Sequence, residues 1–213
     1  MPSHLLINQT NDFIDEHNSH TYLIPIIVSI SNQSVNKIKS ILDVGGGLLP
    51  VSLYIKKYCN IEIPGSIIET PEYTKVLNAL CDKKNISFMR YFSDVSNLDN
   101  KNFDLVYFGS SIQYLKDDVY ITIKKTISYN PKLIAITNNF FIDQDDDLYS
   151  LQAFGGRKHL IPHKFFSYKK MITFFNNEKY KLILDIDHEN SYNHKKLDNK
   201  DFKNKSLLFI KQY

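Results

Sequence analysis

The chain has 213 residues, of which 43% are hydrophobic and 23% charged, and this predicts one globular domain with a real core. The formal net charge of +3 is small and no basic tract stands out, so a nucleic-acid-binding face is not indicated. The two cysteines, Cys59 and Cys81, lack metal-ligand spacing. They predict buried thiols in a reducing compartment rather than a disulfide framework or a metal site.

Residues 1–38 predict a cap segment ahead of the first strand. Within it, residues 22–30 form an apolar run that favours a short helix. The run is too short to span a bilayer and no charged segment precedes it as in a signal peptide, so we expect a cytoplasmic protein without a membrane span. His17, His20 and Tyr22 either line a ligand site or lie on the surface of a polar linker.

Residues 39–58, KSILDVGGGLLPVSLYIKKY, predict a buried strand, a glycine turn and the start of a helix. The strand is apolar apart from Asp43, and Pro50 stands where the first helical position is expected. Glycines in the turn tolerate positive φ and let a ligand approach the backbone closely. The turn consists of Gly45, Gly46 and Gly47. Many folds bind a nucleotide-like cofactor with such a unit.

The residues around this turn distinguish between cofactors. A dinucleotide fingerprint needs a third glycine where this chain has Pro50, and it usually follows a purely apolar strand. The pattern D-V-G-G-G instead resembles the first motif, D/E-x-G-x-G, of class I S-adenosylmethionine-dependent methyltransferases. The resemblance implies that Asp43 and the glycine backbone hold the methionyl part of the cofactor. The structural alternatives are a flexible loop and, for Asp43, a helix-capping or buried paired carboxylate.

Residues 65–69, GSIIE, predict a second strand that ends at Glu69. Glu69 lies 22 residues after Gly47, the distance at which a βαβ unit places a carboxylate that binds both ribose hydroxyls. The alternative is an acid at the start of the helix expected over Pro71 to Cys81. We favour the ribose role because Asp43, the glycines and Glu69 then form one constellation.

Two further strands precede expected cofactor contacts. Residues 86–92 alternate as a strand before Asp94, and the resemblance places Asp94 beside the adenine amino group, although 93–100 is also an ordinary polar loop. Residues 103–108, FDLVYF, form a strand apolar enough to be buried on both faces. GSSIQYL follows it, and the resemblance implies that three polar residues there face the sulfonium and the transferred methyl group. They are Ser110, Ser111 and Gln113.

Residues 132–137 predict a fifth strand, from whose carboxyl end Asn138 to Phe140 emerge. Residues 141–161 read as an irregular loop, and a loop of this length is usually a lid or a binding loop. We expect the segment 141–163 to close over the acceptor. A cationic cluster in it is the candidate for holding an anionic acceptor and for catalysis, with a solvated basic loop as the alternative. It consists of Arg157, Lys158, His159 and His163.

The remaining residues predict a helix over 165–175 and strands over 180–188 and 206–212. The expected fold is therefore α/β, a Rossmann-like, seven-stranded, mostly parallel sheet with helices on both faces and the last strand antiparallel. Residues 1–213 would form a single methyltransferase domain, with a cap over 1–38 and the core over 39–213. The blocks ILDVGGG, ETP, FDLVYFGSSIQYL and FFSYKKMITFF resemble small bacterial methyltransferases of surface-polysaccharide gene sets.

The resemblance implies transfer of a methyl group from S-adenosylmethionine to a small acceptor, leaving S-adenosylhomocysteine. The acceptor would be anionic, phosphorylated or sugar-type, as in capsule or similar polysaccharide biosynthesis. No N-P-P-Y/F sequence follows the fourth strand, so oxygen is favoured over nitrogen as the methylated atom. A hydroxyl acceptor would need a base such as His159, His163 or His20. A nicotinamide-dependent oxidoreductase and a cofactor-binding but inactive partner subunit are the alternative functions. The oligomeric state and the acceptor's identity stay open.

Overall fold

A computed structural model describes residues 26–28, 32, 38–98, 102–115, 118–154, 159–188 and 202–213. The chain divides into two compact units, Met1–Asp99 and Asn100–Tyr213. Residues 26–28 are helical, as expected of the apolar run in the cap segment. His17, His20 and Tyr22 lie outside the described residues. No helix within the described ranges is long and apolar enough to cross a membrane.

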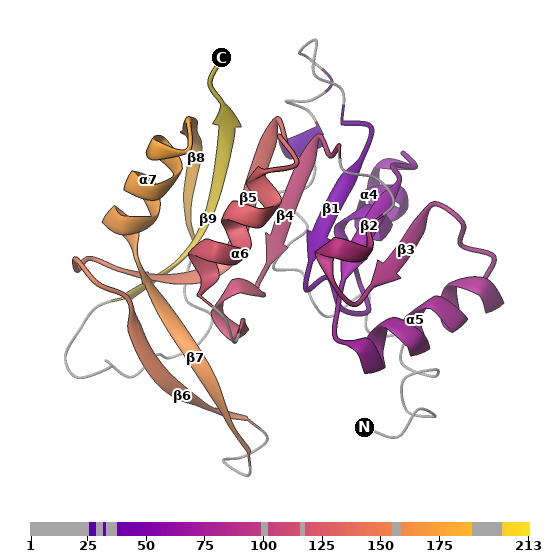
Figure 1. Cartoon of the computed structure of the whole chain (residues 1–213), viewed down its shortest axis with the longest axis horizontal. Helices are drawn as coiled ribbons and strands as arrows, with labels where there is room; N and C mark the ends of the chain where they lie inside the picture. Colours follow the sequence, from indigo (N-terminus) through magenta and orange to yellow (C-terminus); the bar gives the residue numbers. More distant parts are fainter. Residues whose placement is uncertain are drawn as a thin grey trace. The chain divides into compact units, whose positions relative to one another are not determined.

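The first unit is a three-stranded parallel sheet in the order β3-β2-β1 (Figure 1). Its strands are β1 (Ile41–Val44), β2 (Gly65–Ile68) and β3 (Met89–Phe92). Helix α4 (Val51–Cys59) connects β1 to β2, and α5 (Pro71–Lys83) connects β2 to β3. A short 3₁₀ helix, η2 (Val95–Asn97), follows β3.

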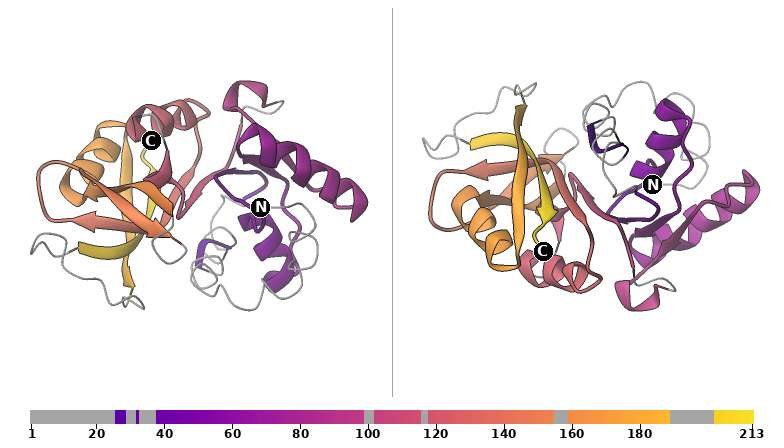
Figure 2. Two further views of the ribbon diagram at one scale, coloured as in Figure 1. Left: turned by 90° about the horizontal axis from the view of Figure 1, so that it is seen from below. Right: turned by 90° about the horizontal axis from the view of Figure 1, so that it is seen from above.

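Helix α5 lies beside β3 (Figures 1 and 2), and an apolar cluster of the first unit is formed there. Ile67 of β2 and Leu77 of α5 are almost completely buried there, together with Cys81. Both cysteines are free thiols, Cys81 buried and Cys59 half-buried. This packing fixes the sheet whose β1 and β2 carboxyl ends carry the glycine turn and Glu69.

The second unit is built on the long strand β5 (Leu133–Ile142). It pairs in parallel with β4 (Leu105–Gly109) and, at its carboxyl end, with β7 (His159–Ser167), and antiparallel with β9 (Phe202–Lys211). Strand β8 (Tyr180–His188) pairs antiparallel with β9, and β6 (Leu148–Phe154) antiparallel with β7. The helical elements are η3 (Ile112–Tyr114), α6 (Val119–Ile127) and α7 (Tyr168–Asn177). The predicted α/β fold and the antiparallel last strand are confirmed.

The structure corrects the expectation of an irregular loop over 141–161. Residues 141 and 142 still belong to β5, 143–147 form a bend, and β6 and β7 then form a hairpin. The hairpin projects from its unit in Figure 1. β6 and β7 are therefore two described strands in the second unit that the sequence analysis did not expect. The expectation relied on the acidic run before residue 148 and on the glycines and charged residues at 155–158. The backbones of Leu148–Phe154 and 159–165 nevertheless pair in an unbroken antiparallel register.

Two element boundaries also differ from the expected ones. β5 continues past Thr137 because a bulge between Ile136 and Asn139 absorbs one residue, with Asn138 at φ +55°. The helix expected from Phe165 begins only at Tyr168. Ser167 is its N-cap, and the Ser167 side chain accepts a hydrogen bond from the Lys170 N–H. Phe165 and Phe166 are thereby left in the sheet.

Candidate functional site

The glycine turn after β1 is organised by the Asp43 carboxylate. Asp43 Oδ2 accepts a hydrogen bond from the Val51 N–H at 2.7 Å, so the carboxylate caps the first turn of α4. Pro50 is the N-cap residue rather than the first helical residue. A Cβ added at Gly46 would lie 2.7 Å from Asp43 Oδ2, so a side chain is excluded there. Gly45 and Gly47 have positive φ, 77° and 55°, which glycine adopts at little cost.

Asp43 is a fully buried acid with spare hydrogen-bonding capacity. Burial raises its pKa to about 7, against the lowering effect of the Val51 N–H, and the charge of Glu69 raises it further. Asp43 Oδ1 has no hydrogen-bond partner among the described residues. A buried carboxylate oxygen without a partner is costly in a native protein. Asp43 therefore has the helix-capping role given above as an alternative, through Oδ2. Its Oδ1 is the oxygen that could accept a hydrogen bond from a ligand.

Glu69 closes the same turn from the end of β2. Glu69 Oε1 accepts a hydrogen bond from the Gly47 N–H at 2.8 Å, and Oε2 accepts from the Thr70 N–H at 3.2 Å. Tyr91 of β3 donates its hydroxyl to the Gly47 carbonyl at 3.0 Å. The turn, Glu69 and Tyr91 are therefore one hydrogen-bonded assembly, which brings together the constellation expected from the spacing.

Tyr91 is a residue that sequence reasoning missed. The alternation along β3 indicates that it is buried, and the structure agrees. Its contact with Gly47, 44 residues earlier, has no local signal in the sequence. Burial raises the pKa of Tyr91, so its hydroxyl remains a donor at all ordinary pH values.

Asp94 has a local structural role. It is exposed and is the N-cap of η2, where Oδ1 accepts a hydrogen bond from the Ser96 N–H at 2.7 Å. This is the polar-loop alternative of the sequence analysis. The expected contact with an adenine amino group stays a prediction.

The residues after β4 supply buried polar atoms. Ser111 and Gln113 are buried, and neither Ser111 Oγ nor Gln113 Oε1 has a hydrogen-bond partner within the described ranges. Ser110 lies at φ +51°, an uncommon conformation for serine, and Asn138 Nδ2 donates to its Oγ at 2.6 Å. Strained backbone and unsatisfied buried groups often occur together at functional sites.

Asn138 extends this network into β9 and β8. The Asn138 N–H donates to Ser206 Oγ at 3.1 Å, and Asn204 Nδ2 donates to Asn138 Oδ1 at 2.5 Å. His188 Nε2 lies 2.5 Å from Ser206 Oγ, and burial lowers the pKa of His188. The sequence analysis placed Asn138 at a ligand-binding end of the sheet. It did not identify the partners of Asn138, because their proximity depends on the antiparallel register of β9.

His163 does not belong to an exposed cationic cluster. It is 4% exposed on β7, and its ring contacts the rings of Tyr114, Phe140 and Phe165 at centroid distances of 5.6, 5.3 and 4.8 Å. The solvated-loop alternative is therefore wrong for His163, because β7 turns its side chain inward. Its expected role toward the acceptor stays a prediction. The His159 backbone pairs with Phe154 at the end of the hairpin. Arg157 and Lys158 lie outside the described residues.

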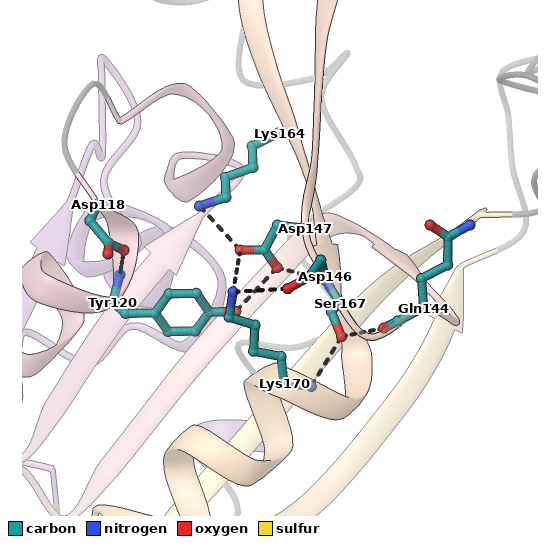
Figure 3. Close-up of polar contacts among 8 residues, drawn as sticks. All are labelled: Asp118, Tyr120, Gln144, Asp146, Asp147, Lys164, Ser167 and Lys170. Carbon is teal, nitrogen blue, oxygen red and sulfur yellow. Dashed lines mark hydrogen bonds and ion pairs between the residues drawn. The ribbon is translucent and has the colours of Figure 1, made fainter.

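A buried ion pair anchors the base of the hairpin (Figure 3). Lys164 Nζ lies 3.2 Å from Asp147 Oδ2, and both side chains are less than a tenth exposed. Asp147 Oδ1 also accepts from the Ser167 N–H at 2.8 Å and from the Tyr120 hydroxyl at 3.3 Å. Burial lowers the pKa of Lys164, but hydrogen bonds and charge from Tyr149 and Asp147 outweigh it and leave the pKa above its usual value.

Two cavities in the second unit have charged linings. One of about 310 Å³ lies at this ion pair and includes Lys170 and Asp146. The other, of about 660 Å³, lies between β5, α7 and β9 and is lined by Tyr168, Asp185 and Lys205 among others. Lys205 pairs with Asp185 at 2.9 Å, and Tyr168 donates to the same carboxylate at 2.6 Å. No group of three or more His, Cys, Asp or Glu side chains suited to a metal occurs in the described ranges.

No protein-family model and no curated protein matches the chain. Solved structures do match it along most of its length. An S-adenosylmethionine-dependent methyltransferase from Clostridium acetobutylicum ATCC 824 is 14% identical with a TM-score of 0.57, and the match covers 98% of this chain and 97% of that one. The N-terminal domain of EvdMO1, in the presence of S-adenosylhomocysteine and D-fucose, is 10% identical with a TM-score of 0.62, covering 93% and 85%.

A third similar structure is Burkholderia thailandensis 1,6-didemethyltoxoflavin-N1-methyltransferase with bound 1,6-didemethyltoxoflavin and S-adenosylhomocysteine. It is 13% identical with a TM-score of 0.58, and the match covers 99% of this chain and 87% of that one. At these identities the similarity is one of fold. The chain has the α/β fold of these methyltransferases.

Proposed function

We propose that the chain is an S-adenosylmethionine-dependent methyltransferase. The observation that carries the proposal is the assembly at the glycine turn: a buried Asp43 with an unpartnered Oδ1, a Gly46 that admits no side chain, and Glu69 on the Gly47 N–H. Burial raises the pKa of Asp43 to about 7, and buried acids with shifted pKa values often lie at functional sites. The shared fold supports the same function.

The residues present fit this cofactor. Asp43 Oδ1 is free to accept from an ammonium group, as the methionyl part carries, and Gly45–Gly47 leave room for it. Each Glu69 oxygen accepts one backbone N–H and retains a lone pair for a ribose hydroxyl. Asp94 would accept from the adenine amino group. After β4, Ser111 Oγ and Gln113 Oε1 have no hydrogen-bond partner among the described residues, and we propose that they and Ser110 face the sulfonium.

The bound cofactor supplies a methyl group activated by the positive sulfur. The protein's part is then to hold an acceptor atom in line with that methyl group, and such positioning can supply much of the rate. An acceptor hydroxyl also needs a base, whereas a carboxylate or phosphate oxygen does not. We propose an oxygen acceptor, since no N-P-P-Y/F sequence follows β4. One similar structure is named an N1-methyltransferase, which makes the methylated atom a point for experiment.

We further propose a small anionic or sugar-type acceptor in surface-polysaccharide biosynthesis. Support comes from the resemblance of four sequence blocks to methyltransferases of such gene sets. It also comes from the small molecules, D-fucose and 1,6-didemethyltoxoflavin, named with two similar structures. Arg157 and His159 remain candidates for holding the acceptor. His163 packs against the rings of Phe140 and Phe165, so we propose that it positions residues that contact the acceptor and does not contact the acceptor itself.

A ligand panel in a thermal-shift assay tests the cofactor. We expect S-adenosylhomocysteine to raise the melting temperature, because a ligand that binds only the native state stabilises it by mass action. NAD and NADP should leave the melting temperature unchanged. A shift with either nicotinamide cofactor and none with S-adenosylhomocysteine would refute the proposal. The Asp43→Asn and Glu69→Ala variants should lose the shift, which assigns it to the glycine turn.

A further inference from the structure

One face of the β6–β7 hairpin carries apolar side chains in solvent. Tyr149 and Leu151 of β6 are 77% and 60% exposed, and Leu160 of β7 is 61% exposed. Leu151 pairs with Pro162, which is also exposed. Side chains two residues apart on a strand, and those directly paired across strands, share a face. These four residues therefore form one apolar face, and such faces usually mark an interaction site.

The opposite face of the hairpin is covered by its own unit. There His163 is buried against Tyr114 and Phe140, and Phe165 packs on Phe202 at a centroid distance of 5.0 Å. A hairpin in water is marginally stable unless more strands or a packed face support it, and this buried face supplies that support. The apolar side chains of the exposed face are therefore not needed to hold the hairpin in place and are accessible to a partner.

β6 also presents an unprotected sheet edge. It pairs with β7 alone among the described residues, so its other edge has unpaired backbone N–H and C=O groups. Natural edge strands are usually blunted by charges, proline or a bulge. The sequence of β6, LYSLQAF, has no charge, no proline and no glycine, and its register with β7 shows no shift. Such a strand is prone to pair with another strand.

We propose that β6 pairs antiparallel with β6 of a second copy of this chain, about a two-fold axis at Leu151, its middle residue. About this axis a residue that lies k positions before Leu151 faces the residue that lies k positions after it in the other copy. β6 carries no charged side chain, so the pairing buries no charge.

This pairing accounts for both unusual features of the hairpin. The two hairpins would join into one four-stranded antiparallel sheet, which satisfies the backbone edge of β6. Leu151 would meet its own symmetry mate, and the apolar faces of the two copies would become continuous. The proposal concerns assembly and does not depend on the methyltransferase activity proposed above.

Light scattering on the full chain, as it elutes from a size-exclusion column, measures the mass of the assembly in solution directly. At ~100 μM, well above a dissociation constant of ~1 μM, we expect about twice the monomer mass of 24.9 kDa. Leu151→Lys places two ammonium groups at the axis and should weaken the dimer by ~100-fold or more. The matched control is Ile121→Lys, since Ile121 is 55% exposed on α6, and this variant should remain dimeric. A monomeric wild-type chain, or a dimer that Leu151→Lys leaves intact, would overturn the proposal.

Cross-linking tests the register without relying on a charged substitution. Leu151→Cys in a Cys59→Ser background should form a disulfide-linked dimer on mild oxidation, because paired residues at the axis have suitable Cα spacing. Ile121→Cys in the same background should not. If the Leu151→Cys chain stays monomeric and its thiol resists alkylation, a segment of the same chain covers β6, and the proposal is wrong.

Discussion

Asp43 couples the glycine turn to pH. Its pKa of about 7 in the folded chain lies above the ~3.9 of an unfolded chain, chiefly because burial disfavours the carboxylate. Between these two values the folded state binds more protons than the unfolded state. The contribution of Asp43 to the free energy of unfolding is therefore fully present below about pH 4 and is lost as pH rises to about 7.

Asp43→Asn should remove this pH dependence. Asn retains an oxygen that can accept from the Val51 N–H but cannot ionise. We expect the free energy of unfolding of the wild type, relative to that of the variant, to fall by as much as roughly 4 kcal/mol between pH 4 and 8, at ~1.4 kcal/mol per pKa unit. Urea denaturation across this range measures it. Asp82→Asn, at an exposed position, is the control, and parallel curves for wild type and Asp43→Asn would contradict the assignment.

Glu69 has two roles that substitutions separate. Glu69→Ala should weaken S-adenosylhomocysteine binding by roughly 2–4 kcal/mol, since two charge-assisted hydrogen bonds to ribose hydroxyls are lost. It should also lower the stability of the ligand-free chain by ~1 kcal/mol, because the Gly47 N–H loses its acceptor. Glu69→Gln keeps that acceptor and should retain the stability.

Calorimetric titration and denaturation of the same Glu69 variants give both quantities. Unchanged affinity in Glu69→Ala, combined with lower stability, would reduce Glu69 to a structural acceptor for the turn.

At the scale of elements, the hairpin base depends on a buried charge pair. Lys164→Met removes the nearer of two lysines from the buried Asp147 carboxylate and leaves only Lys170, whose Nζ lies 3.9 Å from Asp147 Oδ2. We expect a destabilisation of at most ~3–5 kcal/mol. Lys164→Met combined with Asp147→Asn should recover much of this loss, because the buried carboxylate charge is removed as well. Urea denaturation of the two single variants and the double variant measures the coupling. Additive losses would show that Lys164 and Asp147 act independently.

The segment 141–163 is predicted to hold the acceptor. Arg157→Ala should lower turnover and leave S-adenosylhomocysteine affinity nearly intact. His163→Phe preserves a ring among Tyr114, Phe140 and Phe165 and removes only the imidazole. If the imidazole matters for the acceptor, His163→Phe lowers turnover at unchanged stability. Full activity in both variants, measured with the true acceptor, would place the acceptor site elsewhere. The segment around His20 and Tyr22 would then be the next candidate.

At the scale of the whole molecule, we predict that residues 1–213 behave as a single domain. Heat should then unfold the two compact units in one transition, with equal calorimetric and van't Hoff enthalpies. S-adenosylhomocysteine should move that single transition upward. Two separate transitions, of which the ligand shifts one, would show that the units unfold independently and would locate the ligand in one of them.

The sequence by itself determined the parts of the fold that local patterns specify. The apolar run of β1, the glycine turn and the acid at the end of β2 lie within 29 residues of one another, Ile41 to Glu69. Their spacing, together with the resemblance of D-V-G-G-G to a cofactor motif, predicted that Asp43, Gly47 and Glu69 belong together. Asp118 is likewise a local feature: as the N-cap of α6 it accepts from the Tyr120 N–H. Such features depend on neighbours in the chain, which the sequence displays.

Only the tertiary structure decided the features that depend on distant pairing. The bulge that keeps Asn138 in β5 exists because β9, some 66 residues later, pairs with both sides of it. The segment 141–161 became a hairpin, and His163 turned inward, because aromatic rings from η3, β5 and β7 meet there. Tyr91 reaches Gly47 across 44 residues. Burial and register are properties of the assembled sheet, since a side chain's face follows from its pairing partner and not from its neighbours in the chain.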